Sequence, residues 1–337
     1  MSEFRQDPVS GDWVIIAPGR AARPQFLEIK KKARKPSPVA TCPFDDLEKS
    51  GNWPPLAATP SKEKWRVAVI PNKYPALSPA TLSGHGDACS TPFRHGFYRA
   101  MTGIGRHELV IARDHAKNFA ALDRRAAAEV FRAIQARVRA AAKDPCINYV
   151  SIFFNWGPLA GASVWHPHYQ ILALPIVPAH SAGSLAGAKA YFKKNRRCVR
   201  CDILKAEAKE GTRIIAENGN AVAFAPYASK IPLEVRVMPK RHFPYFHKTP
   251  DAVLRDVSFL LQTVLKDMKS RANDPDLNFY IHEAPVDGRN NDYHHWHVEV
   301  LPRVSTPAGF EFSTAIYINV IDPDRAAAIL RGKKISK

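Results

Sequence analysis

The sequence has no long apolar segment and little cysteine. In 337 residues, no apolar run reaches the ~20 residues that span a bilayer, which argues against a membrane partner. The first five residues lack the apolar core of a secretion signal, so we expect a cytoplasmic protein. Only five cysteines are present. Cys89 and Cys146 stand alone, whereas a C-x-x-C pair in a cytoplasmic chain indicates metal or redox chemistry rather than a structural disulfide.

Positive charge is in excess, with a formal net charge of +18. A basic cleft for phosphate-bearing substrates, a nucleic-acid surface and a merely solubilising surface would each explain it. Much of the charge lies in runs such as 30–35 and 193–197, which are usually solvated, and no aromatic-rich nucleic-acid signature accompanies them. These features argue against nucleic acid as a partner.

Two histidine clusters, His166–Gln170 and His295–Glu299, indicate that the chain repeats itself. In each, side chains two apart share one face of an extended strand, so two imidazoles and a third polar group lie together. Such a pair suits metal ligation or nucleophilic attack. His115 and His242 precede the two clusters at similar distances along the chain.

The segments between these histidines predict the same elements in both halves. A helix with apolar residues three and four apart is expected over 122–143 and again over 251–271. Strands are expected before and after each helix, at 109–111 and 148–154 in the first half and at 235–238 and 278–282 in the second. The pattern predicts an α+β fold with antiparallel sheets and one long helix in each half.

The two halves are expected to be separate units of one chain. We assign residues 1–182 to the first, 198–337 to the second, and 183–197, which contain Gly183, Gly187 and a basic run, to a linker.

Two sets of residues have the chemistry of metal ligands. The second-half set is Cys198, Cys201, His242 and His295, and the first-half set is Cys42, Asp45, His115 and His166. Two thiolates and two imidazoles suit tetrahedral zinc, whereas a carboxylate replaces one thiolate in the first set. A chance C-x-x-C beside core histidines is the alternative.

His168 is the candidate nucleophile. The loop before it, 155–163, contains two glycines, the Ser163 hydroxyl and backbone amides that we expect to be free to bind a phosphate. Gln170 shares its face and can donate a hydrogen bond without adding charge. Attack of the imidazole on a phosphoryl group would give a phosphoramidate that passes the group on. The alternative is a core histidine.

The second cluster differs, because Glu299 stands where the first has Gln170 and would repel a phosphate. We therefore expect His297 to be structural or a secondary metal ligand.

These motifs resemble the galactose-1-phosphate uridylyltransferase family, a duplicated branch of the histidine-triad superfamily. The resemblance covers nearly the whole chain and is carried by the segments 5–14, 69–77, 105–108 and 161–168. It implies two tandem histidine-triad-like domains. It also implies a nucleotide sugar that nucleotidylates His168 and a sugar 1-phosphate that then accepts the nucleotide.

The resemblance implies roles for further residues and a partner. Gln170 and Ser163 would act with His168 in catalysis, and the residues that bind the substrate phosphates or nucleotide would be Asn155, Gly161, Ala162, Asn72, Arg20 and Arg23. Both metal sets would bind zinc. Family members are typically homodimers whose sites are completed by the partner's C-terminal region.

Three departures from the family pattern leave the first zinc and the substrate open. Asp45 stands where the family has a second cysteine, which leaves open whether the first set holds zinc. Tyr169 replaces a small residue, which predicts an altered pocket. Residues 309–314 lack the family's hexose-binding pattern and are more similar to the branch that contains ADP-glucose phosphorylase. UDP-glucose:hexose-1-phosphate uridylyl transfer is the leading hypothesis, and ADP-sugar phosphorolysis is the alternative. A third, less favoured hypothesis is a non-catalytic basic zinc protein that binds nucleic acid.

Overall fold

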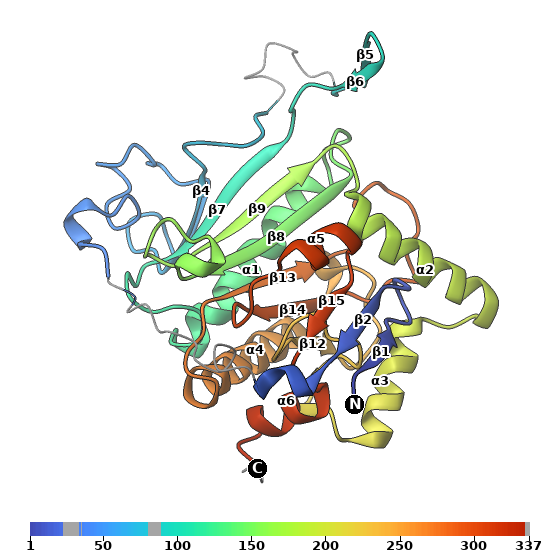
Figure 1. Cartoon of the computed structure of the whole chain (residues 1–337). Helices are drawn as coiled ribbons and strands as arrows, with labels where there is room; N and C mark the ends of the chain where they lie inside the picture. Colours follow the sequence, from blue (N-terminus) through green and yellow to red (C-terminus); the bar gives the residue numbers. More distant parts are fainter. Residues whose placement is uncertain (23–33, 35, 80–88, 334–337) are drawn as a thin grey trace.

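One ten-stranded antiparallel sheet forms the centre of the molecule (Figure 1). The computed structural model describes residues 1–22, 34, 36–79 and 89–333. In spatial order the strands are β10 (Ile214–Glu217), β11 (Ala221–Phe224), β12 (Val235–Pro239), β14 (His297–Pro302), β13 (Leu277–His282), β8 (Tyr149–Trp156), β9 (His168–Leu174), β7 (Arg106–Ala112), β4 (Val67–Pro71) and β3 (Ala57–Thr59). The sheet consists of two five-stranded units of the same strand order, joined edge to edge.

The two units meet where β8 pairs with β13. Phe279 lies opposite Phe154 in this register, and Asn278 lies opposite Asn155. The α+β prediction with antiparallel sheets is confirmed, and the two units share a single sheet. The expected linker falls within helix α2 (Ala179–Asn195) and the turn after it, while the division at 182 and 198 stays a prediction.

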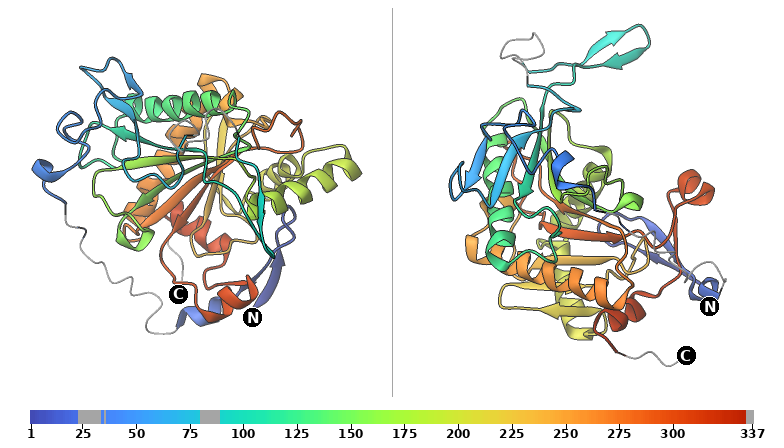
Figure 2. Two further views of the ribbon diagram at one scale, coloured as in Figure 1. Left: turned by 90° about the horizontal axis from the view of Figure 1, so that it is seen from above. Right: turned by 90° about the vertical axis from the view of Figure 1, so that its left-hand side faces the viewer.

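Helices α1 (Arg124–Ala141) and α4 (Asp251–Arg271) lie side by side on one face of the sheet, close to the ranges expected from the sequence (Figure 2). The Asp123 side chain caps α1 by accepting a hydrogen bond from the Ala126 amide. Their apolar stripes pack on alternate strand residues in one core. Phe279 of the second half contacts Phe154 and Phe119 of the first within it, with ring centroids 4.9 and 5.8 Å apart.

The opposite face of the sheet is covered differently in the two halves. Over the first half lies a small apolar cluster that includes Cys42, Phe44 and Trp65. Over the second half lie the turn of the N-terminal hairpin and helices α2 and α3 (Figure 1). The remaining elements are β1 (Glu3–Gln6), β2 (Trp13–Ile16), β15 (Tyr317–Asn319), α3 (Val199–Glu210), α5 (Gly309–Thr314), α6 (Pro323–Leu330), β5 (Phe93–His95), β6 (Tyr98–Ala100) and the 3-10 turns η1 (Pro18–Ala22), η2 (Val39–Thr41), η4 (Pro158–Ala160) and η5 (Phe246–Lys248).

Two buried glutamines tie each helix to the opposite half. Gln135 of α1 donates from Nε2 to the carbonyl oxygens of Phe246 and Thr249, at 3.1 and 2.8 Å. Gln262 of α4 donates in the same way to Phe119 and Leu122, at 3.0 and 2.8 Å. Each helix therefore supplies a side-chain donor for the backbone carbonyls of the segment that leads into the other helix.

The structure corrects the view that Cys89 and Cys146 stand alone, because they form a disulfide. Their positions differ by 57 in the sequence, so spacing along the chain does not indicate the pair. None of the helices described here is both long and apolar enough to cross a membrane.

Gln135→Leu and Gln262→Leu should each lower the free energy of unfolding by about 1–3 kcal/mol, because each removes the side-chain donor that two buried carbonyls share. Urea unfolding followed by circular dichroism measures the change. Lys266→Leu, at an exposed position of α4, is the control and should shift stability by less than about 0.5 kcal/mol. Unchanged midpoints for both glutamine variants would contradict the role assigned to this pair.

Candidate active site and metal clusters

His168 presents a free nitrogen lone pair. It is the first residue of β9, is buried, and has Nδ1 3.0 Å from the carbonyl oxygen of His166. A carbonyl can only accept, so Nδ1 carries the proton and Nε2 keeps its lone pair. Burial lowers the pKa of His168, which favours the neutral imidazole. The ring thus has the protonation state that a nucleophile requires.

Gln170 lies on the same face of β9, and His107 of β7 fixes its orientation. The Ala76 amide donates to Nδ1 of His107 at 3.2 Å, so Nε2 of His107 carries the proton. This Nε2 lies 3.0 Å from Oε1 of Gln170 and donates to it. The Gln170 amide nitrogen is consequently left to donate to a ligand. Asn72, directly after β4, lies beside this pair, and its Oδ1 accepts from the Tyr74 amide at 2.9 Å.

Sequence reasoning did not assign a role to His107. Its signal was present in the segment 105–108, which supported the family resemblance, but the residue contacts Gln170 only because β7 and β9 are paired. Leu109 lies opposite Gln170 in that pairing. His107 is two residues from Leu109 on β7, so its side chain lies on the same face of the sheet as Gln170.

More backbone amides of the loop 155–163 already have hydrogen-bond partners than its sequence predicts. The amides of residues 160–162 donate to carbonyls within the loop, and the Leu159 amide donates to the Asp276 carboxylate at 2.7 Å. The expectation of free amides is therefore wrong for residues 159–162, including those of Gly161 and Ala162. Ser163 is exposed beyond the turn, and Oδ1 of Asn155 accepts from Nδ2 of Asn278 at 2.7 Å.

Gly157 allows this loop to approach Asp276. It has φ +87°, and a Cβ at this position would lie 2.1 Å from the Asp276 carboxylate. Asp276 belongs to the second half, so the loop before His168 is held across the junction between the halves.

Tyr169 does not alter the site, contrary to the sequence prediction. Its side chain points to the opposite face of β9, where it is fully buried and its ring stacks on Phe154 at 4.9 Å. The strand alternation that aligns His168 with Gln170 sends the residue between them into the core beneath α1.

The structure does not bring Arg20 to His168. Arg20 lies in η1 and lines a small cavity with Lys230 and Tyr317, whereas neither His168 nor Gln170 borders that cavity. Arg23 lies outside the described residues.

Both predicted metal sets are assembled. In each set, one ligand atom from every residue lies within 4.8 Å of the others, and the sets are Cys198, Cys201, His242 and His295, and Cys42, Asp45, His115 and His166. Burial raises the pKa of the Cys42 thiol to about 11, so this thiol ionises near neutral pH only if a cation replaces its proton.

Backbone carbonyls orient the imidazoles of these clusters. Nε2 of His115 lies 2.8 Å from the Ser37 carbonyl, and Nε2 of His166 lies 2.6 Å from the Ala112 carbonyl. In the second cluster, Nε2 of His242 lies 3.0 Å from the Asp292 carbonyl. These contacts place the proton on Nε2 and leave each Nδ1 lone pair directed at the cluster. The donors therefore fit a divalent metal such as zinc in both sets.

The second histidine cluster lacks an available nucleophile. Nδ1 of His297 faces the His295 carbonyl as Nδ1 of His168 faces that of His166, but Nε2 lies 3.0 Å from the Glu299 carboxylate. Its ring also stacks on His282, with centroids 5.0 Å apart. Among the described residues, His297 is outside both metal sets.

The chain matches known sequences along its whole length. A profile described as the N-terminal domain of galactose-1-phosphate uridyl transferase matches residues 1–178, and one described as a domain of unknown function, DUF4921, matches residues 97–332. ADP-glucose phosphorylase of Arabidopsis thaliana is 34% identical, over 98% of this chain and 92% of that protein. Galactose-1-phosphate uridylyltransferase of Thermotoga maritima is 24% identical, over 99% of both.

Solved structures give the same grouping. The ADP-glucose phosphorylase from Arabidopsis thaliana with bound ADP-glucose superposes with a TM-score of 0.83 and 31% identity, over 99% of this chain and 100% of that one. A uridylyltransferase superposes with a TM-score of 0.75 and 25% identity, over 98% of both chains.

His107→Phe is expected to lower the turnover number for nucleotidyl transfer about 10- to 100-fold, because the Gln170 amide is then free to rotate away from its productive orientation. His107→Gln, whose amide can still donate to Gln170, should retain more activity. His95→Phe, on the exposed β5–β6 hairpin, is the control. Steady-state kinetics and thermal unfolding are compared for the three variants. Native turnover by a folded His107→Phe protein would refute the positioning role.

Proposed function

This chain belongs to the galactose-1-phosphate uridylyltransferase family of nucleotidyltransferases, and we propose that it transfers a nucleoside monophosphate from a nucleotide sugar through His168. The observation that carries the proposal is the contact between Nδ1 of His168 and the His166 carbonyl oxygen at 3.0 Å, from which we infer that Nε2 keeps its lone pair. The enzyme hypothesis thereby takes precedence over a non-catalytic zinc protein.

The proposed reaction consists of two displacements at one phosphorus atom. Nε2 of His168 attacks the phosphorus of the nucleoside monophosphate, and the bond from that phosphorus to the bridging oxygen breaks. Sugar 1-phosphate leaves with the bonding electron pair, and a phosphoramidate remains on His168. An acceptor phosphate oxygen then attacks the same phosphorus and releases the imidazole. Gln170 would donate its amide hydrogen to the non-bridging oxygens, where charge must be stabilised.

We favour an ADP-sugar as donor and orthophosphate as acceptor. The Arabidopsis thaliana ADP-glucose phosphorylase supports this choice, because it has the higher identity and TM-score of the relatives compared above. UDP-glucose with a hexose 1-phosphate is the second candidate, supported by the uridylyltransferase relatives. Ser163, Asn155 and Asn72 are proposed to contact the phosphates or the nucleotide.

Zinc is the proposed occupant of both metal sets. Zinc bound in these sets would hold the backbone in place rather than take part in the reaction. In the first set it would do so through His166, which lies two residues before His168 at the start of β9. The first set would then hold the carbonyl that orients His168, and the second would fix the C-x-x-C at the start of α3.

A homodimer is proposed as the assembly. Helix α5 projects from the molecule, and Phe312 on it is 78% exposed (Figure 2). Phe310 of the same helix is also exposed, and the two rings together offer apolar area for contact with a second copy of the chain. Light scattering during size-exclusion chromatography would distinguish a dimer from a monomer.

Incubation with ADP-glucose or UDP-glucose, each labelled with ³²P in the phosphate nearest the nucleoside, should transfer label from the true donor to the native protein but not to His168→Gln. Orthophosphate or galactose 1-phosphate should then remove the label, according to which is the acceptor. Denatured protein is counted after acid-free precipitation, because phosphoramidates hydrolyse in acid. Absence of label from both donors, or equal labelling of the His168→Gln protein, would contradict the mechanism.

Elemental analysis should find two zinc ions per native chain. Asp45→Asn should remove the first-set ion and Cys201→Ser the second, because each loses an anionic ligand. The double variant should contain none. A native content of one ion that Asp45→Asn leaves unchanged would show that the first set is not a zinc site.

A further inference from the structure

A buried arginine lacks an ionic partner. Arg200 lies in the first turn of α3, between Cys198 and Cys201, and is 4% exposed. Within the described part of the chain, no carboxylate oxygen lies within 4.0 Å of its guanidinium nitrogens, so Arg200 forms no ion pair there. It donates to the Ser184 hydroxyl at 3.0 Å, and its Nε has no hydrogen-bond partner. A buried guanidinium in this state is costly unless an anion joins it.

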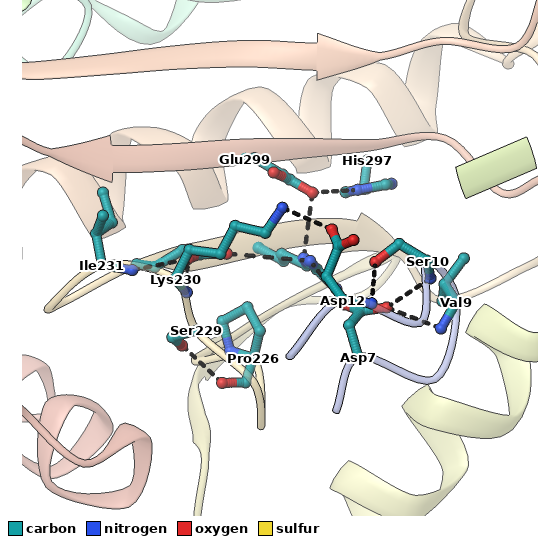
Figure 3. A network of polar contacts seen from close by, with 12 residues as sticks. Asp7, Val9, Ser10, Asp12, Pro226, Ser229, Lys230, Ile231, His297 and Glu299 are labelled. Carbon is teal, nitrogen blue, oxygen red and sulfur yellow. Dashed lines mark hydrogen bonds and ion pairs between the residues drawn. The ribbon is translucent and has the colours of Figure 1, made fainter. Parts of the chain in front are cut away.

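Arg200 borders a cavity of about 260 Å³ over the second half of the sheet. Helix α2 contributes Ser184 and His180 to its wall, and strands β12, β13 and β14 form its floor. The turn of the N-terminal hairpin closes another side (Figure 3). None of the residues proposed to act with His168 lines this cavity.

The aspartates of the cavity are already partnered. Asp7 accepts from the amides of Val9 and Ser10, at 2.7 and 3.1 Å, and pairs with Arg236 at 3.3 Å. Asp12 pairs with Lys230 at 2.8 Å (Figure 3). Neither carboxylate reaches Arg200.

The glutamates are also engaged. Glu299 lies 3.3 Å from Nε of Arg236 and 3.0 Å from His297. Glu234 accepts from the amides at 230 and 231 and lies 4.0 Å from Arg236, and burial raises the pKa of its carboxyl to about 7. The carboxylates of Asp7, Glu234 and Glu299 therefore all lie within 4.0 Å of Arg236, whereas Arg200 is the buried cation without a carboxylate at that distance.

We propose that this cavity binds a small oxyanion, either inorganic phosphate or the phosphate group of a sugar phosphate, on Arg200 with Ser184 beside it. The planar guanidinium presents paired donors that match phosphate oxygens. The volume lies below the roughly 300–1,000 Å³ of pockets that hold larger ligands, so a nucleotide sugar is too big. The site is separate from His168 and does not depend on the transfer reaction.

Equilibrium dialysis of the His168→Gln protein against ³²P-phosphate tests the site without turnover. Excess ADP-glucose is added to displace phosphate from the nucleotide site. We expect about one phosphate per chain to resist this competition. Arg200→Gln should weaken that binding at least about tenfold, the loss of a charge-assisted contact, whereas Arg197→Gln, three residues earlier and exposed, should not.

The same dialysis is repeated with labelled glucose 1-phosphate. Whichever of the two ligands binds more tightly shows whether the site takes inorganic phosphate or the phosphate group of a sugar phosphate. Complete displacement of both ligands by ADP-glucose, or equal affinity in the Arg200→Gln protein, would overturn the proposal.

Two further measurements do not depend on the folding of Arg200→Gln. Ser184→Ala, away from the cysteines, should weaken phosphate binding several-fold while the zinc content stays native. Crystals of the unmutated protein soaked in tungstate should show anomalous density within hydrogen-bond distance of Arg200. Tungstate found only at the surface, as an adventitious ion, would refute the site.

Discussion

The pairing of β8 with β13 is the constraint on which the rest of the structure depends. It joins two five-stranded units into one sheet and sets both long helices on the same face. Gln135 and Gln262 then satisfy backbone carbonyls across the junction, and Phe279 packs on rings from the other half. The same junction places Asp276 against the loop before His168, so the proposed site depends on both halves.

Backbone carbonyls decide the chemistry of the histidines. A carbonyl facing Nδ1 of His168 leaves Nε2 free to attack, and carbonyls facing Nε2 of His115, His166 and His242 leave Nδ1 free to bind a metal. The residue type is the same in both roles. The position of one acceptor oxygen, set by strand and loop geometry, separates the proposed nucleophile from the proposed metal ligands.

The two halves have kept one scaffold and diverged in charge. In the first, a neutral glutamine lies beside the reactive histidine. In the second, Glu299 occupies the equivalent place, blocks Nε2 of His297 and pairs with Arg236. Buried carboxylates and guanidiniums then pair with one another around the cavity over this half, and Arg200 has no carboxylate partner there. The second half therefore has no available nucleophile at this place, and a polar cavity lies there instead.

Residue types and their spacing were enough to predict the duplication, the long helices, the antiparallel sheets and the assembled metal sets, and they indicated His168 as the candidate nucleophile. Each of these follows from residue type and from spacing along one or two elements, since strand alternation and helical periodicity are local properties.

Only the tertiary structure decided which groups are free to act. It paired Cys89 with Cys146, engaged the loop amides through Asp276, turned Tyr169 into the core, kept Arg20 away from His168 and brought His107 onto Gln170. These outcomes depend on hydrogen-bond partners and contacts between segments far apart in the chain. Partner choice of that kind is set by how strands and loops pack, which spacing along one chain does not encode.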